Sequence, residues 1–279
     1  MQNILSIDVE DWFHILDLAE APDLDGWEKL ESRVEKNFQR LLDELRVSDT
    51  KATCFFLGWV AERFPELVRR AHEAGHEVAS HGYAHQLVYG LSREAFAEDI
   101  TRAKRILEGI VGGPVVGYRA PGFSIVAETP WAFEELRKAG YEYDSSVFPA
   151  SRGHGGMAGA DVKPHRIGTA SGELVEFPIS VASVLGKKVC FFGGGYLRLF
   201  PYALIERMSA QVNADGRPVV YYVHPREIDP EQPRMKMGPF RRFKSYVNLE
   251  TTLPKLRRLS ATQSLMPFRD WMRQNPLPN

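Results

Sequence analysis

The sequence has little cysteine, no appreciable net charge and no long apolar run. Two cysteines in 279 residues are too few for a disulfide framework or a thiolate zinc site. Lys plus Arg number 35 against 36 Asp plus Glu, so no general attraction to nucleic acid is expected. No stretch approaches the ~20 apolar residues that cross a bilayer, and the acidic N-terminus lacks the basic region of a signal peptide. We therefore expect a cytoplasmic protein that binds no nucleic acid.

Short apolar runs alternate with segments of helical periodicity. The runs lie at residues 3–9, 52–57, 76–80, 115–118, 141–146 and 218–223. Between them, apolar side chains recur every three or four residues, as in the helix expected over 27–45. This alternation predicts an α/β fold with parallel βαβ units, either a barrel or a doubly wound sheet. In both folds the ligands bind at the carboxyl ends of the strands.

The alternation breaks near residues 150–200, where glycines and short strand-like runs predict an inserted lobe. We expect one barrel domain over residues 1–230, including this lobe, and a basic C-terminal extension over 231–279 packed on the barrel. The extension holds 10 Lys plus Arg against 3 Asp plus Glu, and basic residues alternate with aromatic ones over 240–246. Two interpretations stay open: a solvated face, or a peripheral contact with an anionic membrane surface or a lipid-linked sugar.

Two pairs of residues have the spacing of metal ligands. Asp8 and Glu10 are two residues apart in a strand, so both side chains project to the same face. His81 and His85 are four apart and would share a face over one helical turn. Two imidazoles and a carboxylate leave one coordination position open, as in catalytic zinc sites. Taken alone, Asp8 and Glu10 also fit a solvated strand end, and an HxxxH pair often occurs by chance.

Three further residues follow predicted strands. Arg119 opens the segment RAPGFS, where a fixed cation would orient a carboxylate and keep it ionised. Asp144 lies in YDSS, and His224 is followed by Pro225. Each alone is compatible with a purely structural role. The two pairs and these three residues nevertheless occur in order at the ends of predicted strands. A barrel collects its catalytic groups at that edge, and this favours catalysis.

The order of these motifs resembles that of the polysaccharide deacetylase family, also known as the NodB-homology or carbohydrate esterase family 4 enzymes. The resemblance covers residues 4–225 and implies an irregular, incomplete (β/α) barrel. The phrases IDVEDWF, YDSSVFP, GGGYLR and HPREIDPEQPR are similar to the subgroup associated with bacterial exopolysaccharide biosynthesis. The matching residues are Asp8 with Glu10, His81 with His85, Arg119-Ala120-Pro121, Asp144, and His224-Pro225.

The resemblance implies a metal site held by Glu10, His81 and His85. The cofactor would be one divalent ion, zinc first, with cobalt, nickel or iron as alternatives. The family's first motif has two adjacent acids, whereas Val9 intervenes here, so either Glu10 or Asp11 is the acidic ligand. We favour Glu10 because it shares a strand face with Asp8.

The resemblance also implies the catalytic roles. Asp8 would be the general base, and Arg119 would hold it in place and oppose its protonation. His224 would protonate the departing amine, with Asp144 orienting or tuning that histidine.

The implied reaction removes an N-acetyl group from an amino sugar of a bacterial surface polysaccharide or its precursor, which is lipid-linked in one interpretation. Two other functions stay open: an amidohydrolase of the same fold acting on a non-sugar C–N bond, and an inactive carbohydrate-binding scaffold. The presence of Asp8, Arg119 and His224 favours an enzyme, because a binding scaffold needs no acid and base.

Overall fold

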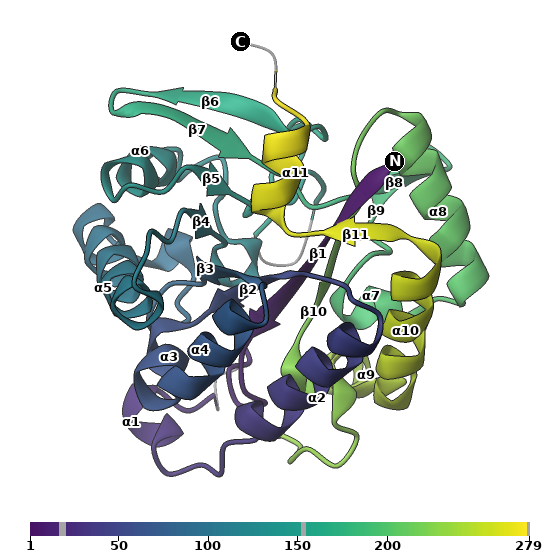
Figure 1. Cartoon of the computed structure of the whole chain (residues 1–279), viewed down its shortest axis with the longest axis horizontal. Coiled ribbons are helices and arrows are strands. Elements are labelled where there is room, and N and C mark those ends of the chain that lie inside the picture. Colours follow the sequence, from purple (N-terminus) through teal and green to yellow (C-terminus); the bar gives the residue numbers. More distant parts are fainter. Residues whose placement is uncertain (17–20, 152–154, 278–279) are drawn as a thin grey trace.

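We describe a computed structural model of the chain, covering residues 1–16, 21–151 and 155–277. Helices surround a curved nine-stranded sheet, and a separate two-stranded sheet lies at one side (Figure 1). The strands are β1 Gln2–Val9, β2 Thr53–Phe56, β3 Glu77–Ser80, β4 Gly117–Tyr118, β5 Tyr143–Asp144, β6 His165–Thr169, β7 Gly172–Glu176, β8 Ala182–Val184, β9 Lys187–Val189, β10 Val220–Val223 and β11 Ser264–Met266. The helices are α1 Leu24–Trp27, α2 Val34–Val47, α3 Gly58–Arg63, α4 Pro65–Glu73, α5 Arg93–Val111, α6 Trp131–Lys138, α7 Gly194–Leu199, α8 Tyr202–Ala214, α9 Pro239–Tyr246, α10 Thr252–Thr262 and α11 Phe268–Gln274, with 3₁₀ turns η1 Val88–Gly90, η2 Pro121–Phe123, η3 Pro225–Ile228 and η4 Leu249–Thr251.

The main sheet follows the order β10-β1-β2-β3-β4-β5-β7-β6. Every neighbouring pair along this path is parallel except the hairpin of β6 and β7. The end strands β6 and β10 do not pair with each other within the described part of the chain, so the barrel stays open. This confirms the predicted α/β class and the incomplete (β/α) barrel.

Alternate residues of β1 serve opposite faces of the sheet, as the pleat of a strand requires. Leu5, Ile7 and Val9 pack in the apolar cluster that contains Phe38 and Leu41 of helix α2. Ile4 belongs instead to the cluster on the inner face, and Ser6 and Asp8 share its side of the strand. The inner face is therefore apolar near the amino end of β1 and polar near its carboxyl end.

The helix expected over 27–45 is wrong at its start, because α1 and α2 are separate helices. The Asp11 carboxylate accepts hydrogen bonds from the backbone N–H groups of Arg33 and Val34 and from Ser32 Oγ. These bonds satisfy donors that a helix N-terminus leaves unpaired, so α2 begins at Val34. A tertiary contact thus sets a boundary that periodicity alone did not show.

The second half of the chain extends the sheet at both ends. In the region of the predicted lobe, β7 pairs with β5, whereas β8 and β9 form the separate hairpin; residues 152–154 lie outside the described ranges. Beyond residue 230, β11 pairs with Gln2–Ile4 of β1, on the same edge that β2 occupies at Ser6–Val9. The domain boundary at 230 stays a prediction. None of the described helices has the length and apolar character needed to cross a bilayer.

Candidate active site

The carboxyl ends of the parallel strands meet at one edge of the sheet and carry polar side chains there. Glu10 directly follows β1, His81 follows β3, and His224 follows β10. Together with Asp8 and His85, these residues line a cavity of about 640 Å³. Five of the seven site residues predicted from the sequence therefore share one cavity.

Glu10 lies between the two histidines of the HxxxH pair. Its Oε1 is 3.0 Å from His81 Nε2 and 2.9 Å from His85 Nε2, and all three side chains are buried. Ligand atoms of a tetrahedral zinc ion lie roughly 3.3 Å apart, given bonds of about 2.0–2.1 Å. The two distances from Glu10 are within a few tenths of an ångström of this value, and all three ligand atoms lie within 4.8 Å of one another, so the residues fit a metal site.

Each histidine has a specific support. His81 Nδ1 donates to the carbonyl of Arg119 at 2.7 Å, which leaves Nε2 as the acceptor or ligand atom. His85 lies in a loop with φ of 51°, and the Asp99 carboxylate anchors that loop by accepting the N–H groups of Tyr83 and Ala84. The helical turn expected for this pair is therefore wrong, although the two rings do converge.

The structure places Glu10, and not Asp11, beside the histidines, because the Asp11 carboxylate is occupied at the start of α2. Burial alone would raise the pKa of Glu10, but His85, His224 and His81 hold it well below its usual value. Glu10 is thus ionised and has the charge expected of a metal ligand.

Asp8 is held by Arg119, and its carboxylate lies within 4.8 Å of Glu10. Arg119 Nη1 donates to Asp8 Oδ1 at 2.7 Å and to Ser6 Oγ at 2.8 Å, and the guanidinium lies over the Phe55 ring. On a flat sheet β4 and β1 would be three strand spacings, roughly 14 Å, apart. The direct contact therefore shows how strongly the sheet curves, and it fixes the position of the Asp8 carboxylate at the site.

His224 faces both carboxylates. Its Nε2 is 3.7 Å from Asp8 Oδ2 and 3.9 Å from Glu10 Oε1, whereas its Nδ1 is 3.2 Å from Glu227 Oε2. Burial lowers the pKa of His224, but Glu227, Glu10 and Asp8 outweigh burial and raise it. The ring is thus set up to carry a proton on the Nε2 that faces the cavity.

Glu227 is itself paired with a buried cation that the sequence motifs did not identify. Arg198 Nε donates to Glu227 Oε1 at 3.1 Å. Burial would raise the pKa of Glu227, but Arg198 and His224 hold it at about 2. For Glu227, the signal available in the sequence was the spacing His224-x-x-Glu227, which is that of a capping box. In the structure the Glu227 carboxylate also accepts the His224 backbone N–H.

The role predicted for Asp144 is wrong. Its carboxylate accepts from Ser146 Oγ and lies beside Glu176, and burial raises its pKa to about 6. Glu227 is the carboxylate bonded to His224. Asp144 does lie at the expected strand end, but its hydrogen bonds support the chain after β5 rather than His224.

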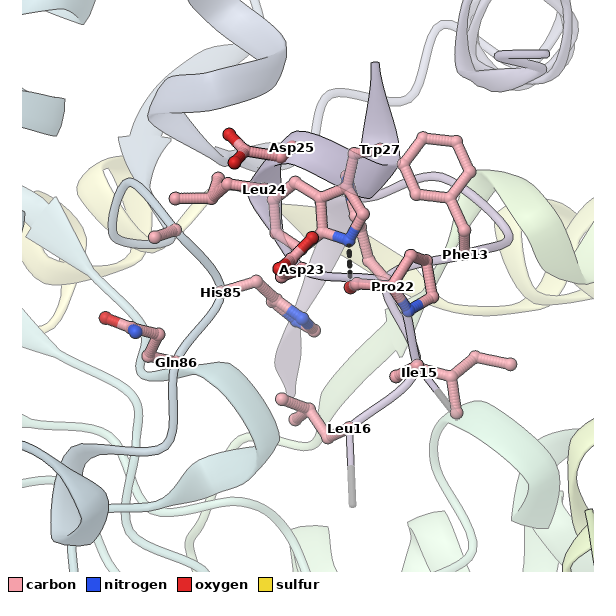
Figure 2. A pocket seen from close by; sticks show the side chains of 13 residues that line it. Phe13, Ile15, Leu16, Pro22, Asp23, Leu24, Asp25, Trp27, His85 and Gln86 are labelled. Carbon is pink, nitrogen blue, oxygen red and sulfur yellow. Dashed lines mark hydrogen bonds between the residues drawn. The ribbon is translucent and has the colours of Figure 1, made fainter. Parts of the chain in front are cut away.

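His14 is a second residue that the motifs missed. Its Nδ1 accepts the backbone N–H of Asp11 at 3.1 Å, so Nε2 carries the hydrogen, and this buried Nε2 has no partner among the described residues. His14 and His85 line both the main cavity and a neighbouring pocket of about 500 Å³. In Figure 2, Trp27 and Pro22 border this pocket near His85, and the Trp27 indole donates to the Pro22 carbonyl.

Together, the open (β/α) barrel and its strand-end cluster of carboxylates and histidines define an α/β protein with a candidate metal site at the carboxyl ends of its strands. Residues 25–143 match the polysaccharide deacetylase family model, and residues 145–273 match a domain of unknown function, DUF3473. The peptidoglycan-N-acetylglucosamine deacetylase of Bacillus cereus is 31% identical over 97 residues, which are 34% of this chain and 35% of that protein. The match confirms the predicted resemblance to the polysaccharide deacetylase (NodB-homology) family over residues 25–143, and the chain spans about a third of that relative's length.

Two solved structures share the fold over nearly the whole chain. A protein from Mycobacterium smegmatis described as a polysaccharide deacetylase superposes with a TM-score of 0.64 at 21% identity, covering 98% of this chain and 89% of its own. Puue allantoinase superposes with the same TM-score at 14% identity, covering 99% and 92%. At these identities the likeness concerns the fold, including the second half of the chain.

Proposed function

We propose that the chain is a metal-dependent hydrolase that removes N-acetyl groups from an amino sugar of a bacterial surface polysaccharide or its precursor. The observation that carries the proposal is the position of Glu10 Oε1, within 3.0 Å of two histidine Nε2 atoms and 3.9 Å from His224. The proposed metal ligands, the proposed base Asp8 and the proposed acid His224 thus all face the same part of the cavity. The family match and the deacetylase relative support the reaction class.

Glu10, His81 and His85 would hold the ion, which would supply Lewis-acid polarisation of an amide carbonyl. Zinc suits two imidazoles and a carboxylate, and cobalt, nickel or iron accept the same donors. Asp8 Oδ2, free of the Arg119 bond to Oδ1, takes a proton from the attacking water. His224 Nε2 gives a proton to the departing amine nitrogen, and the contact of His224 Nδ1 with Glu227 fixes the orientation of the ring.

The proposal is tested by measuring acetate release from N-acetylated oligosaccharides and peptidoglycan fragments. The metal-free protein is reloaded in turn with zinc, cobalt, nickel or iron. Acetate should appear only with a bound ion, and Asp8→Asn should keep the ion while losing about a thousandfold in rate. Asp43→Asn on the exposed side of α2 serves as the matched control.

Absence of acetate from every glycan, in protein shown to hold about one ion per chain, would contradict the proposal. Ureide hydrolysis in the same preparation would instead favour the non-sugar amidohydrolase. Full activity of Asp8→Asn would exclude Asp8 as the base.

A further inference from the structure

Large apolar side chains are exposed at the mouth of the active-site cavity. Nine large hydrophobic residues are exposed in the described part of the chain, and four of them line this cavity. Phe240 is 74% exposed and Phe243 51%, and their spacing of three on α9 places both on one face of the helix. We call the four residues the mouth patch: Tyr89, Leu199, Phe240 and Phe243.

Cations accompany the mouth patch. Helix α9 has the sequence PFRRFKSY, with three basic residues and no acid. Lys244 Nζ lies 5.3 Å from the centroid of the Phe240 ring, and Arg226 and Arg241 also line the cavity. Aromatic rings with flanking Lys and Arg are typical of helices that lie in the interface of an anionic bilayer.

Helix α9 is firmly held beside the catalytic histidine. Arg198 donates to the carbonyls of Lys244, Ser245 and Val247 at the end of α9, and the same guanidinium donates to Glu227. Gly195 packs so closely that a Cβ there would lie 2.9 Å from the Lys244 carbonyl oxygen. The exposed rings therefore have a fixed position relative to His224 and are not carried on a loose tail.

We propose that the mouth patch and the cations of α9 dock the protein on an anionic phospholipid bilayer, with the active-site cavity facing the membrane. A soluble acidic glycan would neutralise the cations but leave the phenyl rings and Leu199 in water, whereas a bilayer interface accommodates both. If the proposed function holds, the substrate is an amino-sugar glycan attached to a lipid. That last step rests on the proposed function, but the docking itself does not.

The docking is tested by co-sedimentation of the full chain with vesicles of phosphatidylcholine alone or mixed with phosphatidylglycerol. Wild type should bind the mixed vesicles far better than the neutral ones. Combined Phe240→Ser and Phe243→Ser should lower binding about tenfold or more, and combined Arg242→Glu and Lys244→Glu should abolish the preference for anionic lipid.

A matched control is available at the other end of the molecule. Val47 is 81% exposed beside the exposed Arg46, at the end of α2 that leads into the amino end of β2, opposite the site. Val47→Ser with Arg46→Glu should leave vesicle binding unchanged, and circular dichroism should show that all variants are folded.

Three results would overturn the docking proposal: no binding of wild type to anionic vesicles, equal binding by the phenylalanine variant, or binding to a soluble acidic polysaccharide without binding to vesicles. Failure to release acetate would count against the proposed function alone, because vesicle binding requires no turnover.

Discussion

His81, His85 and Arg119 come from residues 25–143, whereas His224, Glu227 and Arg198 come from residues 145–273. In the first region, His81 and Arg119 directly follow parallel strands of the sheet. In the second region, the orientation of His224 depends on a chain of polar contacts that joins η3 to α7 and α9. Both regions thus place a histidine directly after a parallel strand, and the second adds the buried pair of Arg198 and Glu227 that holds the His224 ring.

This difference separates two tasks. The first region, with β1, supplies the candidate metal ligands and the proposed base, and the second supplies the proposed proton donor and most of the mouth patch. Changes in the first region should therefore remove the metal, whereas changes in the second should leave the metal bound and alter proton transfer.

The largest effect is expected from removing the metal ligands. Combined His81→Ala and His85→Ala should reduce the bound metal from about one ion per chain to a trace and lower turnover by about a thousandfold or more, because two of three ligands are lost. Metal analysis and acetate release measure the two effects. His72→Ala, an exposed histidine on α4, is the control. Undiminished metal content in the double variant would show that the ion binds elsewhere.

A smaller effect is expected in the second region. Glu227→Gln should keep the metal but lower turnover about 10- to 100-fold, because His224 loses the anion that orients its ring and raises its pKa. Since the protonated imidazole is the active form, a lower pKa of His224 moves the alkaline limb of the pH–rate profile to lower pH.

The exposed Glu250→Gln on η4 is the control for this change, and it should alter neither turnover nor the pH profile. A Glu227→Gln profile that coincides with wild type, or loss of the metal, would contradict the separation of tasks between the two regions.

The same comparison explains what the sequence could predict. Asp8, Glu10, His81 and His224 were found because the carboxyl ends of parallel strands meet at one edge, so a strand-end residue has a predictable neighbourhood. The role of Asp144 was not predictable in this way. It lies at such an edge, but its partners Ser146 and Glu176 are defined by the chain path after β5 and by β7.

Other features depend on contacts that leave no periodic pattern. Strand β11 has three residues, too few for alternation to be visible, and it forms only because β1 offers a free edge at Gln2–Ile4. The buried pair of Arg198 and Glu227 spans 29 residues, so no local spacing indicates it. The loop at His85 depends on Asp99, which lies on helix α5.

The smallest effect concerns the contact that joins the two regions outside the site. Arg33 and Asn37 at the start of α2 donate to Asp229 Oδ2 at 2.9 and 3.2 Å. Asp229→Asn should lower the free energy of unfolding by about 1–2 kcal/mol at pH 7, the usual cost of losing hydrogen bonds to a charged group. Asp215→Asn, whose side chain is 54% exposed, should cost less.

The pH dependence of that loss distinguishes a charge effect from a packing effect. Burial would raise the pKa of Asp229, but the bonds from Arg33 and Asn37 lower it overall. The stabilisation is therefore present above the unfolded pKa of about 3.9 and disappears as the pH falls through the lower folded pKa. Urea unfolding of both variants at pH 7 and near pH 3 should show the difference from wild type shrinking with acid. A constant difference would mean that the asparagine disturbs packing, and a biphasic transition would mean that the two regions unfold separately even though β1 pairs with β2, β10 and β11.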